Sequence, residues 1–166
     1  MNYAQILLNI LSYSEARIRL IKDGTFHARP KVGAWAPKEI LGHLIDSAYN
    51  NHQRFLRAQK QDHLVFQGYD QNEWVIMNRY LYRGREDIIQ TWMTANRHLA
   101  NLLDAIPEKV MEEEHSMHNF SRIGWNKVPA DQPATLSHLV WDYIHHMEHH
   151  LSQLIEGYEK HLQASA

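Results

Sequence analysis

The sequence predicts an all-α fold, a four-helix bundle with long irregular connections after its second and third helices. Apolar residues recur at helical spacing in four long segments, and residues typical of helix ends bound these segments. Few segments alternate as strands do, and no internal repeat is visible. Four amphipathic helices bury their apolar stripes against one another. Because 166 residues suffice for one packed core, we expect a single domain over residues 1–166.

Glycine and proline delimit the first two helices. Residues 2–22 form the first expected helix, which Asp23-Gly24 ends because glycine is favoured just past a helix terminus. The second helix starts at Pro37, since proline suits the first helical turn, and runs to about Lys60. Its expected inward-facing residues are Ile40, Leu41, Leu44, Ile45, Ala48, Phe55 and Leu56.

Long irregular segments separate the remaining helices. Residues 62–83 are rich in aromatic side chains, with a short helix expected near residues 71–79. The third helix is expected over residues 86–105 and ends before Pro107, and the connection over residues 108–133 has room for a short hairpin. The fourth helix starts near residues 133–135 and runs to about Leu162. Such connections exclude simple up-down-up-down loops throughout the bundle.

The last expected helix carries two overlapping pairs of histidines, each with a spacing of four residues. They are His145 with His149 and His146 with His150. Histidines at this spacing lie one turn apart on one helix face, so both imidazoles of a pair can reach one divalent cation. A third ligand from another helix would complete a facial site. The spacing alone is a weak motif, because ordinary surface histidines show it too.

Periodicity favours the second pair. His145 and His149 point away from the apolar stripe of this helix, on a face with Asp142 that we expect to be solvated. His146 and His150 lie on the flank of the stripe, where neighbouring side chains can desolvate and hold a ligand. The stripe itself consists of Leu136, Leu139, Val140, Tyr143, Met147, Leu151, Leu154 and Tyr158.

A third ligand is available on the second helix, from His43 or His52. Periodicity places His52 nearer the apolar stripe and His43 on a polar strip with Ser47, Asn50 and Arg54. A buried histidine is more often a satisfied core residue than a ligand, and a polar strip can line an open cleft between helices. The pattern slightly favours His52 as the buried residue and leaves the choice of ligand open.

Composition excludes several classes of site and of protein. There is no cysteine, which excludes disulfides, thiolate nucleophiles and cysteine-ligated zinc. The net charge is −2 with histidine neutral, and no basic run indicates a nucleic-acid partner. The N-terminus has no basic signal region, and the apolar stretch over residues 6–11 is too short for a signal peptide or a membrane span. We therefore expect a cytoplasmic protein that binds neither nucleic acid nor membrane.

Three segments carry a family resemblance: residues 35–47 (Trp-Ala-Pro-Lys-Glu-Ile-Leu-Gly-His-Leu-Ile-Asp-Ser), 68–74 (Gly-Tyr-Asp-Gln-Asn-Glu-Trp) and 145–153 (His-His-Met-Glu-His-His-Leu-Ser-Gln). In order and spacing they resemble the DinB/YfiT-like superfamily of metal-binding four-helix bundles. The resemblance implies one histidine ligand from the Gly-His-Leu segment and two from the last helix, which correspond to His43, His146 and His150. It therefore selects His43 over His52. It also implies nickel, zinc, iron or manganese as the ion, and a homodimer.

The chemistry of such a site depends on its open coordination positions. Three imidazoles leave room for water or substrate, and the cation lowers the pKa of a bound water or thiol. Some members of the superfamily are transferases that use bacillithiol, mycothiol or glutathione. A chain without cysteine would need such a thiol as cosubstrate, and a thiol-dependent transferase is our first expectation. The alternatives are a metal-dependent hydrolase of a small molecule and a non-catalytic, stress-associated metal-binding protein.

Two further sets of residues are candidates for the surroundings of the site. Asp46, three residues after His43, could accept a hydrogen bond from its imidazole and orient it, or could simply face solvent. Aromatic residues of the irregular middle segment could form the wall of a substrate pocket; they are Phe66, Tyr69, Trp74 and Tyr80.

Overall fold

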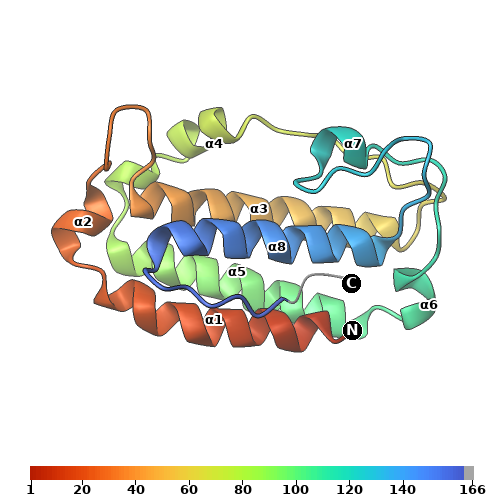
Figure 1. Ribbon diagram of the computed structural model, residues 1–166, viewed down its shortest axis with the longest axis horizontal. Helices are drawn as coiled ribbons and strands as arrows, with labels where there is room; N and C mark the ends of the chain where they lie inside the picture. Colours follow the sequence, from red (N-terminus) through yellow and green to blue (C-terminus); the bar gives the residue numbers. More distant parts are fainter. Residues whose placement is uncertain (163–166) are drawn as a thin grey trace.

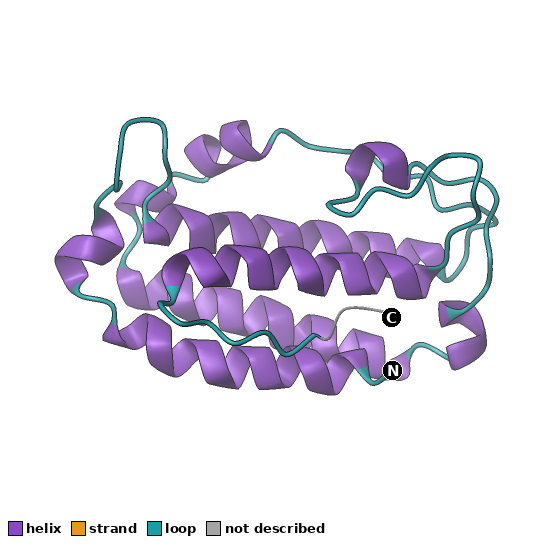
Figure 2. Ribbon diagram, viewed as in Figure 1, coloured by secondary structure: helices purple, strands orange, loops and turns teal. Residues whose placement is uncertain are grey.

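Four long helices form the bundle in the computed structural model, which describes residues 1–162 (Figure 1). They are α1 (Tyr3–Leu20), α3 (Pro37–Ala58), α5 (Arg85–Ala105) and α8 (Leu136–Leu154). Within the described residues there is no β-strand, as the colouring of Figure 2 makes plain. The all-α four-helix bundle expected from the apolar periodicity is therefore confirmed.

The helices do not alternate in direction along the chain. Figure 1 shows that α3 and α5 run in the same direction, while α1 and α8 run in the opposite one. The connection between α3 and α5 must therefore return along the length of the bundle, and it does so over α3. This confirms that simple up-down-up-down loops do not join all the helices.

Apolar side chains from all four helices meet in one core. Helix α1 packs on α5, α5 on α3, α3 on α8, and α8 on α1. The side chain of Trp92 on α5 is fully buried at 0% exposure, as are Leu7 on α1, Leu44 on α3 and Val140 on α8. Leu56 was expected to face inward on α3 but is 41% exposed, because it lies at the edge of the apolar stripe.

The starts of α1 and α3 carry residues that favour a helix start. The side chain of Asn2 accepts a hydrogen bond from the amide of Gln5 at the start of α1, and Pro37 occupies the first turn of α3. One expectation was wrong. Asp23-Gly24 was expected to end the first helix and begin a loop, but α1 ends at Leu20 and these residues open the short helix α2 (Asp23–His27).

The long connections contain short helices. Helix α4 (Gln71–Met77) matches the short helix expected there, and a 3-10 turn, η1 (Tyr80–Tyr82), follows it. The segment between α5 and α8 contains α6 (Glu108–Met111) and α7 (Phe120–Ile123). In place of the expected hairpin, the described residues have a single antiparallel bridge between His115 and Ala134.

The end of α8 comes earlier than periodicity predicted. Thr135 caps its first turn by accepting a hydrogen bond from the amide of His138, but the helix stops at Leu154 and not near Leu162. The backbone of Ile155 is extended, and Gly157 has a φ of +67°, which only glycine adopts readily. The apolar stripe therefore continues in the sequence beyond the last residue of the helix.

The segment after α8 turns back along the bundle (Figure 1). Glu148 of α8, at 0% exposure, accepts hydrogen bonds from the Tyr158 hydroxyl at 3.2 Å and from the backbone amides of His161 at 2.5 Å and Leu162 at 3.2 Å. A buried carboxylate requires such donors, since an unpaired buried charge is costly.

Among the described helices, none has both the length and the apolar character needed to cross a membrane.

Candidate metal centre

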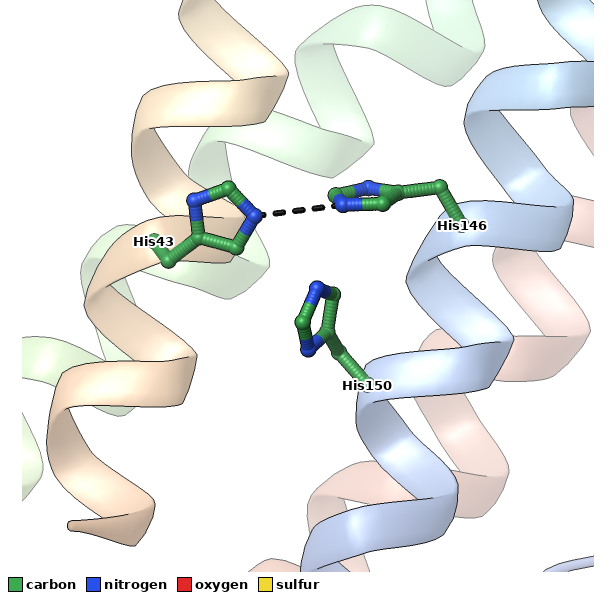
Figure 3. A group of neighbouring side chains, drawn as sticks. All are labelled: His43, His146 and His150. Atoms are coloured by element: carbon green, nitrogen blue, oxygen red, sulfur yellow. Dashed lines mark hydrogen bonds between the residues drawn. The ribbon is translucent and has the colours of Figure 1, made fainter. Parts of the chain in front are cut away.

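Three imidazoles converge between α3 and α8. His43 projects from α3, and His146 and His150 project from successive turns of α8, as Figure 3 shows. One ring nitrogen of each residue lies within 4.8 Å of one from each of the others. The centroids of the His146 and His150 rings are 4.6 Å apart, and those of His43 and His150 are 4.9 Å apart. We call these three residues the histidine group.

The spacing of the nitrogens suits coordination of one ion. The Nε2 atoms of His43 and His146 lie 3.2 Å apart. Two nitrogens that are each about 2.0–2.1 Å from one ion are separated by about 3.0–3.4 Å in adjacent coordination positions. The donor set of three imidazoles suits zinc, copper, iron or nickel better than magnesium or calcium, which prefer oxygen. The residues present therefore fit a divalent transition metal.

A glutamine orients the imidazole of His150. The Nδ1 atom of His150 is 3.0 Å from Oε1 of Gln153, an acceptor, so this nitrogen carries the proton. The lone pair is then on Nε2, which points toward the other two rings in Figure 3. Hydrogen bonds of this kind fix the tautomer and orientation of metal-binding histidines. Sequence reasoning did not assign this role to Gln153, although its spacing of three residues from His150 on the helix is compatible with it.

Burial keeps the three rings neutral. His43 is 1% exposed and His150 is 8% exposed. Burial, with a smaller contribution from His150, lowers the pKa of His43 to about 3. Burial also lowers the pKa of His146 well below its ordinary value, and that of His150 to a lesser degree. Neutral imidazoles have the free lone pairs that a metal requires.

A close packing contact supports the α3 side of the site. The ring of Tyr80 lies against Gly42, where an added Cβ would be only 2.3 Å from the ring carbons. The Tyr80 hydroxyl donates to Oδ1 of Asp46 at 2.7 Å, and Nδ2 of Asn78 donates to the same oxygen at 2.9 Å. The residue before His43 is therefore a glycine because the aromatic ring occupies the space of a side chain.

Asp46 does not have the role expected of it. Its carboxylate accepts hydrogen bonds from Tyr80 and Asn78, and Nδ1 of His43 has no hydrogen-bond partner among the described residues. Asp46 is not solvent-facing either, since it is 4% exposed and burial raises its pKa to about 6. The carboxylate holds the segment around η1 against α3.

The outer pair of histidines on α8, His145 and His149, faces a different neighbour. Nδ1 of His145 lies 2.8 Å from Nδ2 of Asn126, and the ring of His149 lies 4.5 Å from that of Trp125. This face was expected to be solvated, but residues 124–126 of the connection after α7 cover it. Asp142 on the same face is only 6% exposed, which corrects the expectation. The cover comes from a distant segment that helical periodicity cannot reveal.

A cavity of about 230 Å³ opens beside the histidine group. His43 and His146 form part of its wall, together with polar residues of α3 and residues of the connections. Of the aromatic residues expected to form such a wall, Tyr69 does, whereas Phe66, Trp74 and Tyr80 do not line this cavity. Its remaining lining residues are Ser47, Asn51, Arg54, Gly68, Gln71, Arg122, Ile123, Gly124, Trp125, Leu139, Asp142 and Tyr143.

The structure brings His43 together with His146 and His150, and it places His52 and the outer pair elsewhere. His52 is partly exposed and lies beside His98 of α5, with their ring centroids 4.7 Å apart. The choice between His43 and His52 came from the family resemblance, since periodicity pointed the other way. Trp35, whose ring centroid is 5.1 Å from that of His43, is a further neighbour of the site.

Comparisons with known proteins agree with this description. A family model described as the DinB superfamily matches residues 10–154. A solved structure, described as "YfiT from Bacillus subtilis is a probable metal-dependent hydrolase with an unusual four-helix bundle topology", aligns with a TM-score of 0.74. The two share 16% sequence identity over 92% of this chain and 81% of that chain, a level that establishes the fold alone. No curated protein gives a significant match.

Proposed function

The chain belongs to the DinB superfamily, and we propose that it hydrolyses a small molecule. The reaction would depend on a divalent metal ion held by His43, His146 and His150. The observation that carries the proposal is the convergence of three neutral imidazoles, of which His43 and His150 are buried and His146 is half-buried, with His43 and His146 in the wall of a cavity. The description of YfiT as a probable metal-dependent hydrolase supports the same reaction class.

Each residue of the site has a physical task in this proposal. The ion, when bound, supplies a Lewis acid that polarises a substrate oxygen and acidifies water. His146 and His150 provide two lone pairs from one helix face, and His43 closes the set from α3. Gln153 holds the proton on Nδ1 of His150, so that its Nε2 remains free to bind. Trp35 packs beside His43 and Trp125 beside His146, with ring centroids 5.1 Å and 5.5 Å apart.

A thiol-dependent transferase is the second candidate. The absence of cysteine means that a thiol would have to enter the cavity as a cosubstrate. A single assay separates the two reactions, because transfer requires added thiol and hydrolysis does not. We expect turnover of an ester and amide panel by metal-loaded protein without thiol. A dependence on bacillithiol, mycothiol or glutathione would instead favour the transferase.

Metal content is the first measurement. Protein purified without a nickel resin should contain about one divalent ion per chain by elemental analysis, and its identity would choose among nickel, zinc, iron and manganese. Turnover should be lost on chelation and return with that ion. Stoichiometric metal without any turnover would favour a non-catalytic metal-binding protein, which is the third alternative.

The homodimer remains a proposal too. Large apolar side chains are exposed on α3, α4 and η1, and they are Tyr49 at 56%, Ile76 at 70%, Met77 at 74% and Tyr82 at 79%. An exposed apolar patch is typical of an interaction surface. Light scattering at micromolar concentration should give the mass of two chains, and the mass of one chain would contradict the proposal.

A further inference from the structure

A buried arginine lies in the cavity beside the histidine group. Arg54 of α3 is only 9% exposed and lines the same cavity as His43 and His146. Its guanidinium donates to the backbone carbonyl of Gln67 at 3.1 Å and, at a long 3.4 Å, to Oδ1 of Asn51. Both acceptors are neutral. Five N–H donors are available on a guanidinium, so these bonds leave donors free.

The positive charge of Arg54 has no directly bonded carboxylate, and Asp142 stabilises it only through space. Among residues 1–162, no acidic side chain forms a salt bridge with it. The one carboxylate that lines the cavity, Asp142, accepts from the Trp125 amide at 2.9 Å, from the Asn126 amide at 2.6 Å and from the Asn126 side chain at 2.8 Å. It is therefore engaged by the covering segment.

The charge balance of the cavity favours an anion. Burial lowers the pKa of Arg54, which measures the cost of desolvating its charge, yet an arginine remains protonated in proteins. Arg122, an exposed residue, is a second arginine of the lining. A buried charge without a directly bonded counter-charge is costly, and strongly perturbed groups that line a cavity are typical of functional sites. A carboxylate or a phosphate matches the planar fork of an arginine.

We propose that Arg54 binds an anionic group of the substrate, a carboxylate or a phosphate, while the scissile bond lies at the histidine group. This inference rests on the proposed hydrolase function and adds the substrate class to it. The preferred substrates are small anionic molecules in which the charged group and the hydrolysed bond lie at separate positions.

The placement of the two residues on α3 supports this division. His43 and Arg54 are eleven residues apart, so their Cα atoms are separated by about 16 Å along the helix axis. Long side chains on a helix point back toward its N-terminus, and the contact of Arg54 with Asn51, three residues earlier, is consistent with this. The contact places the guanidinium on the His43 side of its own Cα atom.

Anion binding can be measured without turnover. Metal-free full-length protein should be titrated with inorganic phosphate and with acetate at constant ionic strength, with tryptophan fluorescence and calorimetry as readouts. We expect one saturable site per chain. Arg54→Gln should weaken binding at least tenfold, and Arg54→Lys should weaken it less because the charge remains. Arg57→Gln is the matched control, since Arg57 is an exposed arginine of the same helix outside the cavity lining.

A substrate pair gives an independent test that does not require Arg54→Gln to fold. Two esters, identical except for a distal carboxylate or its neutral amide, should be compared with metal-loaded wild-type protein and Arg54→Lys. We expect a KM at least tenfold lower for the carboxylate with a similar kcat, and a smaller ratio in the variant. Equal KM values, or phosphate binding unchanged in Arg54→Gln, would overturn the inference.

The two proposals fail in different ways. Hydrolysis that ignores the distal charge would leave the hydrolase standing and remove the anion site. Arg54-dependent binding of phosphate by a protein that hydrolyses neither ester would support the anion site and remove the hydrolase.

Discussion

The inner pair of histidines on α8, His146 and His150, and the outer pair, His145 and His149, have the same spacing on the same helix and differ by a single residue in register. The inner pair faces α3 and meets a third imidazole there. The outer pair faces the connection after α7, where it meets an asparagine and a tryptophan. The local motif is the same in both pairs. Only the pair that faces another imidazole across the helix interface is a candidate ligand set.

The largest expected effect separates the two pairs directly. His150→Ala or His146→Ala should weaken metal affinity by more than about 100-fold, because loss of a ligand exceeds the effect of removing its hydrogen-bond partner. His145→Ala and His149→Ala should retain about one ion per chain. Metal content after dialysis against a competing chelator measures this. Retention of metal by His150→Ala, with loss in His149→Ala, would reverse the assignment of the two faces.

The next effect concerns what holds the inner pair in place. Gln153→Ala should weaken metal affinity by about 10- to 100-fold, since the Nδ1 proton of His150 loses its acceptor. Ser152→Ala is the matched control, because its hydroxyl bonds only the backbone carbonyl of His149. The measurement is competition with a fluorescent chelator. Equal affinities in the two variants would show that the glutamine does not orient the ring.

On the α3 side, the glycine before His43 is expected to matter for stability. Gly42→Ala should destabilise the protein by about 1–2 kcal/mol, because the new Cβ would displace the Tyr80 ring. Helix propensity alone predicts the opposite sign. Gly24→Ala, in helix α2 with nothing within 4 Å of the added Cβ, is the control. Urea unfolding of metal-free protein would contradict the prediction if Gly42→Ala were neutral or stabilising.

The smallest expected effect is a dependence of stability on pH. The folded-state pKa of His43 is about 3, below its ordinary value of 6.5, so between these values the unfolded chain binds the proton more readily. The contribution of the neutral His43 ring to the free energy of unfolding is therefore fully present above pH 6.5 and is lost as the pH falls toward 3. Metal-free His43→Gln should lose about 1 kcal/mol less stability than wild type between pH 7.5 and pH 5.5. An identical loss of stability in wild type and His43→Gln would contradict the lowered pKa of His43.

Local signals predicted the long helices and the inner pair, and contacts between distant segments decided the rest. Periodicity placed His146 and His150 on the flank that faces α3, but it favoured burial of His52 over that of His43. Only the packing of α3 on α8 places His43 against the other two rings. The cover over Asp142 could not be predicted either, because residues 124–126 reach it from a connection without helical periodicity.

Glu148 gives the assembly of the site an order in time. Its carboxylate lies between the two inner histidines in sequence, and its donors are Tyr158, His161 and Leu162, which are synthesised after α8. Because a chain is made from its N-terminus, α8 emerges with a carboxylate that still lacks its partners. The Glu148 carboxylate therefore gains these donors only when residues 158–162 have docked. A chain shortened before Tyr158 would carry all three imidazoles but would leave the buried carboxylate of Glu148 without these donors.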